Sequence, residues 1–178
     1  MPASAIRVWD PLVRVVHWSV ACLVVMDLVN EAGANPWHRY LGYACGALVA
    51  VRLAWGVIGT PYARLSSIAT SARRIGPYLT RSASREVRLF HAGHNPLGAW
   101  MALVLWGLIL LAVATGWMLQ LDAFWGDEAM QTAHAAASYA LAGCAVLHVA
   151  GVLVTSVLQR TNLVKAMITG SKNPGLPN

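Results

Sequence analysis

Charged side chains are scarce in this chain, because only 11% of its 178 residues are Asp, Glu, Lys or Arg. An ordinary soluble domain has roughly 25%. Hydrophobic residues make up 57% of the chain, and the mean hydropathy is +0.54. This composition excludes an ordinary soluble domain and predicts an integral membrane protein. At about 20 residues per spanning helix, the length allows a single domain with four spans and one sizeable loop.

Cysteine is also rare. The three cysteines, Cys22, Cys45 and Cys144, all lie in apolar segments at spacings that do not suit a metal site. The sequence contains no Cys-x-x-Cys-His motif, which excludes the usual covalent attachment of a c-type haem. Nothing marks a nickel, iron–sulfur or flavin site, and we interpret the cysteines as small residues of the helix core.

What the chain does have is four long apolar segments. They run from Leu12 to Val29, Trp37 to Gly59, Pro96 to Leu119 and Met130 to Leu158. We therefore predict an all-α fold, a transmembrane four-helix bundle that forms one domain over residues 1–178. The one long connection is the loop of residues 60–95, in which Ser66 to Leu89 can form an amphipathic surface helix interrupted at Gly76-Pro77.

The charges are distributed unevenly between the two ends of these spans. Eleven of the thirteen basic residues lie in the two terminal tails and the 60–95 loop, and five acidic residues lie at the opposite ends of the spans: Asp27, Glu31, Asp122, Asp127 and Glu128. The positive-inside rule then predicts that both termini are cytoplasmic in a bacterial inner membrane. The net charge of +6 is a topology signal that favours contact with anionic lipid, not with nucleic acid.

Four histidines fall at two depths of the predicted bundle. His134 and His148 lie fourteen residues apart, which places them on nearly the same helix face about 21 Å apart along the axis. His17 lies at the inner depth of His148, and His38 lies at the outer depth of His134. Ionisable side chains inside a membrane are functional candidates. Facing pairs of histidines in a bundle suit the iron of two b-type haems, with His17 and His148 on one and His38 and His134 on the other.

Two arginines lie near the inner pair. Arg52 follows His38 by fourteen residues, so it faces the same way at the inner depth, where its guanidinium could bind a haem propionate. Alternatively, Arg52 extends to the lipid head groups. Both interpretations fit the sequence. Arg14 offers a second cation near the same haem.

His94 precedes the helix start Asn95-Pro96, in which asparagine is a typical N-cap and proline a typical first residue. It could be a proton donor in a quinone site or an alternative inner-haem ligand, but a plain position at the helix entry is the simpler interpretation. His91 and Asp27 are weaker candidates for the quinone site. Glycines allow close approach of a macrocycle or of another helix at positions 42, 46, 98, 107, 116, 143 and 151.

Three segments occur in a characteristic order: VWDPLVRVVHW at 8–18, RLAWGVIGTPYAR at 52–64 and GHNPLG at 93–98. Together they resemble the bacterial cytochrome b561 family, which includes the cytochrome b subunits of nickel–iron hydrogenases. The resemblance implies a four-helix cytochrome with two haems b that exchanges electrons with quinone. It also implies ligands on the first, second and fourth spans, which match His17, His38, His134 and His148.

We therefore predict a transmembrane electron carrier between the quinone pool and a periplasmic partner, such as a c-type cytochrome or a dehydrogenase, or a small oxidant. No catalytic acid or nucleophile is needed for this function. Two alternatives stay open. One is a cytochrome b anchor subunit of a periplasmic hydrogenase or dehydrogenase. The other is a non-redox channel or transporter with buried histidines as a proton path.

Overall fold

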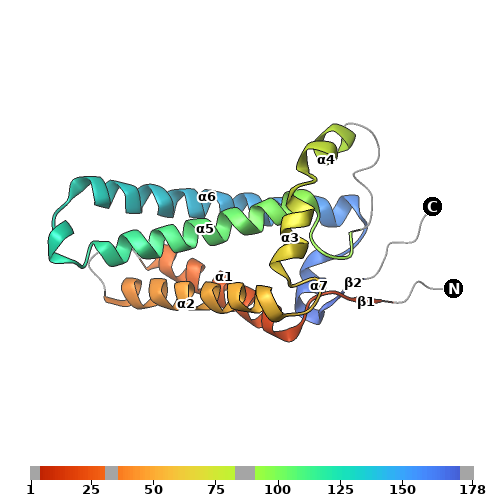
Figure 1. The fold of residues 1–178 in the computed structure, drawn as a ribbon, viewed down its shortest axis with the longest axis horizontal. Helices are drawn as coiled ribbons and strands as arrows, with labels where there is room; N and C mark the ends of the chain where they lie inside the picture. Colours follow the sequence, from red (N-terminus) through yellow and green to blue (C-terminus); the bar gives the residue numbers. More distant parts are fainter. Residues whose placement is uncertain (1–4, 31–35, 83–90, 173–178) are drawn as a thin grey trace.

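The computed structural model describes residues 5–30, 36–82 and 91–172 of the chain. Its architecture is a bundle of four long helices, which are seen side by side in Figure 1: α1 (Pro11–Val29), α2 (Pro36–Ile58), α5 (Pro96–Met118) and α6 (Glu128–Leu158). Each is long and apolar enough to cross a membrane. The predicted all-α membrane bundle is confirmed, and the bounds of each predicted span lie within two residues of its helix.

Short polar side chains fix where three of these helices begin. Asp10 accepts a hydrogen bond from the Val13 amide at 2.9 Å, and Asn95 accepts one from the Gly98 amide at 2.6 Å. Asp127 caps α6 through the Met130 amide at 2.9 Å. Such caps satisfy amides that have no partner within the helix. Proline follows both Asp10 and Asn95, so the helix start predicted at Asn95-Pro96 is confirmed.

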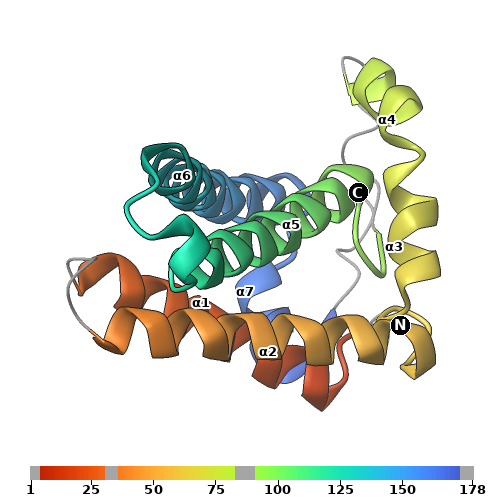
Figure 2. The same cartoon turned by 60° about the vertical axis from the view of Figure 1, so that its left-hand side comes forward.

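The four helices pack as two pairs, α1 with α2 and α5 with α6, which are joined where α2 packs against α5 (Figure 2). Cys45, Val49 and Ile109 form the buried core of that α2–α5 contact. Among the described elements, α1 and α6 do not form another closely packed pair. This matters because the candidate ligands of α6 face helices of the other pair.

The two strands and the shorter α-helices gather at one end of the bundle (Figure 1). The strand β1 (Ile6–Arg7) pairs antiparallel with β2 (Ser171–Lys172), which packs against α7 (Leu163–Thr169), and α3 (Leu65–Ala72) packs against α5 and α2. We call this end the strand end. The opposite end, which carries the short 3-10 helix η2 (Asp122–Phe124), is called the loop end.

The amphipathic segment between α2 and α5 differs from its prediction. It forms α3 and a second short helix, α4 (Ile75–Ser82), and the break lies at residues 73–74. The predicted break at Gly76-Pro77 is wrong, because both residues lie in the first turn of α4, where a proline has no intrahelical hydrogen bond to lose. Residues 83–90 of the predicted segment lie outside the described ranges.

Candidate functional site

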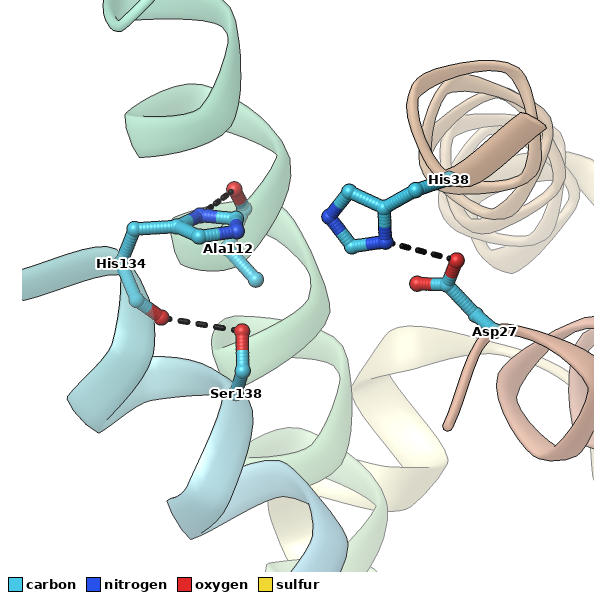
Figure 3. A network of polar contacts seen from close by, with 5 residues as sticks. All are labelled: Asp27, His38, Ala112, His134 and Ser138. Carbon is cyan, nitrogen blue, oxygen red and sulfur yellow. Dashed lines mark hydrogen bonds and ion pairs between the residues drawn. The ribbon is translucent and has the colours of Figure 1, made fainter. Parts of the chain in front are cut away.

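At the loop end, His38 of α2 and His134 of α6 face each other. Their ring centroids are 5.9 Å apart, and the ring planes lie at 81°. Figure 3 shows that one nitrogen of each ring is directed toward the other ring. Both side chains are partly buried. The structure thus brings together the two residues that the sequence predicts as the outer pair.

The other nitrogen of each ring is held by a hydrogen-bond acceptor (Figure 3). The Nδ1 of His38 lies 2.8 Å from Oδ1 of Asp27, and the Nδ1 of His134 lies 3.0 Å from the backbone oxygen of Ala112. With Nδ1–H donating to these acceptors, Nε2 is left with its lone pair. Histidines that bind metals are oriented in this way by a carboxylate or a carbonyl on the second nitrogen.

The ring of His134 packs closely against helix α5. A Cβ atom added at Gly116 would lie only 3.0 Å from Cε1 of His134, so a larger residue here would press against the ring. The buried Thr115 hydroxyl lies 3.1 Å from His134 Nδ1 and donates to the Leu111 carbonyl at 2.8 Å. Sequence reasoning found Gly116 as a position of close approach, but it missed Thr115.

At the strand end, His17 of α1 and His148 of α6 form the second pair. Their ring centroids are 6.3 Å apart, with an angle of 60° between the planes. The Nδ1 atom of His17 is buried and has no hydrogen-bond partner in the described part of the chain. The predicted inner pair therefore also meets in space, although its two residues come from the first and last of the four long helices.

Both separations fit an iron atom between the two rings. An iron bonded to one nitrogen of each ring at about 2 Å would hold the two centroids roughly 6 Å apart. Within the described ranges, no group of three or more His, Cys, Asp or Glu side chains could hold a metal ion. Each pair offers two imidazole rings, which could hold a haem and complete the ligands of its iron.

Two cations, the buried Arg52 and the partly buried Arg14, lie at the same end as this pair. Arg52 is 4% exposed and donates through Nη2 to the Ala63 carbonyl at 2.9 Å, while its Nη1 is buried without a partner among the described residues. Arg14 donates through Nη2 to the Ile168 carbonyl, and its Nε is likewise buried and unpaired there. Leaving a charged donor unpaired is costly. The burial of Arg52 favours an anionic partner inside the bundle over its extension to the head groups.

His94 packs beside this region. Its ring lies edge-on against Trp9, with 4.8 Å between the centroids. Burial, together with the positive charges of Lys172 and Arg52, lowers the pKa of His94 to about 3, so the imidazole is neutral near pH 7. The structure pairs His148 with His17 rather than with His94.

The Lys172 side chain joins β2 to the segment before α5 at the strand end. Its Nζ donates to the backbone oxygens of His91 at 3.1 Å and Gly93 at 3.0 Å, and it lies 5.5 Å from the centre of the Trp9 ring. Burial lowers the pKa of Lys172 to about 8. The C-terminal strand thereby fixes the segment that leads into α5.

Asp10 ties the start of α1 to the end of α2. Its Oδ2 accepts hydrogen bonds from Trp55 Nε1 at 3.0 Å and from the Thr60 hydroxyl at 2.7 Å. Burial alone would raise the pKa of Asp10, but hydrogen bonds from Trp55, Val13 and Thr60 hold it below its usual value. The three sequence segments at 8–18, 52–64 and 93–98 therefore meet around the strand-end pair.

A family model described as prokaryotic cytochrome b561 matches residues 8–170. The chain belongs to the prokaryotic cytochrome b561 family. No match was found among curated proteins or among solved structures. As a cytochrome b561, the protein is a multi-pass membrane protein that binds b-type haem and transfers electrons across the membrane. Family membership favours electron transfer over the non-redox channel.

Proposed function

We propose that this cytochrome b561 holds two haems b, one between His17 and His148 and one between His38 and His134. The observation that carries the proposal is the pair of matched ring separations, 6.3 Å and 5.9 Å, at two depths of the same helix. Haem supplies a reversible one-electron couple, and the protein ligates it, orients it and tunes its potential.

The two arginines at the strand end, Arg52 and Arg14, are proposed to bind the haem propionates there. The Nη1 of Arg52 and the Nε of Arg14 are buried donors without a partner in the described part of the chain, and a carboxylate would satisfy both charge and hydrogen bonding. His17 lies one turn beyond Arg14 on α1, so the cations and the ligand belong to the same part of the bundle.

The strand end is proposed to face the cytoplasm of a bacterium, with the protein in its inner membrane. Ten of the thirteen basic residues lie in the terminal tails and the 60–95 loop, and Arg14 in the first turn of α1 makes eleven on the side that the positive-inside rule assigns to the cytoplasm. These basic residues would also contact anionic lipid head groups. The loop end, with acidic residues such as Asp122, would then face the periplasm.

Quinone is the proposed electron-transfer partner at the strand end. A neutral His94 imidazole can donate a hydrogen bond to a quinone oxygen, and Arg14 and His17 lie in the same region. At the loop end, a c-type cytochrome, a dehydrogenase or a small oxidant would exchange electrons. The exposed acidic side chains Asp122, Asp127 and Glu128 would speed the association of a basic protein partner.

A role as the anchor subunit of a periplasmic hydrogenase or dehydrogenase is the second candidate. It uses the same loop end and the same acidic residues, but the partner would be a permanent subunit. Purification in mild detergent separates the two candidates, because an anchor subunit copurifies with its enzyme in a fixed ratio.

The test of the two-haem proposal is pyridine haemochrome analysis of the purified protein. We expect two haems b per chain, and a value near one would overturn the proposal. For the quinone site, a quinone analogue should perturb the spectrum of the strand-end haem. Perturbation of the loop-end haem alone would place the quinone at the other end.

A further inference from the structure

Asp27 lies in the last turn of α1, and its carboxylate meets His38 in the first turn of α2. The Oδ1 atom of Asp27 is 2.8 Å from Nδ1 of His38, and the side chains are 23% and 29% exposed, respectively (Figure 3). Among the described residues, the structure gives the Asp27 carboxylate no other hydrogen-bond partner. A carboxylate within an apolar helix is costly unless it is paired. The contact therefore restricts both side chains.

The other candidate ligands have different surroundings. His134 donates to the neutral backbone oxygen of Ala112, and Nδ1 of His17 has no partner in the described part of the chain. The strand-end pair lies near the cations Arg14 and Arg52. The loop-end pair thus has a negative charge hydrogen-bonded to one ring, whereas the carboxylate at the strand end, Asp10, bonds to Trp55 and Thr60 beside Arg52 and to neither histidine ring.

We propose that Asp27 is a positioning residue that orients His38 and gives the loop-end haem the lower midpoint potential of the two. This inference rests on the proposed function, in which His38 is an axial ligand. A carboxylate hydrogen-bonded to Nδ1–H raises the basicity of the imidazole ligand. A more basic ligand and a nearby negative charge both favour ferric over ferrous iron. Arg14, one turn before His17 on α1, would have the opposite effect on the haem at the strand end.

The variant Asp27→Asn tests the charge with little change of shape, because its amide oxygen can still accept the His38 hydrogen bond. We expect the purified variant to keep two haems, with a raised loop-end potential and an unchanged strand-end potential in a redox titration. The loop-end haem is assigned as the one that His134→Ala loses. The matched control is Asp122→Asn, which removes the same charge from an exposed position at the same end and should move neither potential.

Three results would overturn the role of Asp27: no shift, an equal shift of both haems, or the same shift in Asp122→Asn. Asp27→Asn could instead lose the loop-end haem. Binding of this haem by Asp27→Glu would then support the positioning role. Loss of the haem from both variants would count against a specific effect of charge. His38→Ala tests the proposed function separately. If that variant keeps both haems, His38 is not a ligand and both proposals fall.

Discussion

The rings of His17 and His148 lie 6.3 Å apart, although α1 and α6 are not among the closely packed helix pairs of the described structure. At both histidine pairs, one ring thus comes from α1 or α2 and the facing ring comes from α6. A group shared between the rings would join parts of the bundle that make few other contacts.

Removal of haem should therefore destabilise the bundle. Binding to the folded state alone stabilises a protein by about 3 kcal/mol when the free ligand is near 100 times its Kd. We expect the haem-free protein to unfold at a lower temperature than the loaded protein in the same detergent. Equal unfolding temperatures would show that haem does not connect the helices.

His148→Ala should lose the strand-end haem, and His134→Ala the loop-end haem, because the two ligands lie at different depths of α6. Haem content should fall from two to one per chain in each variant, with different haem signals missing. Circular dichroism controls for helix loss. Loss of both haems from a variant with intact helicity would contradict two independent sites.

Arg52→Ala should lower the midpoint potential of the strand-end haem, because the removal of a buried cation disfavours the additional electron of the reduced state. A tenfold change in the redox equilibrium corresponds to about 59 mV for one electron, and we expect a shift of this order. Arg39→Ala is the control, since Arg39 lies at the loop end and bonds Gln120 Oε1. A redox titration that shows equal shifts of both haems in Arg52→Ala would refute the propionate contact.

Gly116→Ala should weaken or abolish binding of the loop-end haem. The new Cβ would lie 3.0 Å from Cε1 of His134, so the ring must move. Such overpacking typically costs about 1–3 kcal/mol. Gly107→Ala is a matched control on the same helix, because a Cβ there meets no atom within 4 Å. Haem content and the loop-end spectrum give the measurement, and similar behaviour of the two variants would contradict the expected steric effect.

His94 should make the protein less stable in acid. Its pKa is about 3 in the folded chain and 6.5 in its ordinary state, so the unfolded chain binds one more proton between these values. The stability contributed by the buried neutral ring is therefore complete above pH 6.5 and is lost as the pH falls toward 3. We expect His94→Gln to lose less thermal stability between pH 7 and about pH 4.5 than the unmodified protein. An identical loss in both proteins would show that His94 does not titrate in this way.

Much of the bundle could be predicted because membrane spans depend mainly on the length and hydropathy of a segment. The pairing of the histidines could be predicted for a similar reason, since a spacing of fourteen residues fixes both the face and the depth of a side chain on a regular helix. The predicted roles of these histidines in holding haem stay predictions until haem binding is measured.

Other features depend on contacts that a linear pattern does not contain. The sequence indicates Asp27 only as a weak quinone-site candidate, because its contact with His38 depends on how α1 and α2 are joined. Its signal in the sequence was an acidic residue within an apolar span. The break after α3 was misplaced because Ile68 and Ala72 pack against Ala99 of α5, which is a tertiary contact. The β1–β2 pairing joins segments too short to show any alternation.

The spacing of fourteen positions from His134 to His148 also fixes a distance. One continuous helix carries a proposed ligand from each pair, so its rise of about 1.5 Å per residue would set the distance across which an electron tunnels between the two proposed haems. Substitutions in the loops leave this span unchanged. A single residue inserted between the two histidines would instead turn one of them by about 100° and remove it from its partner.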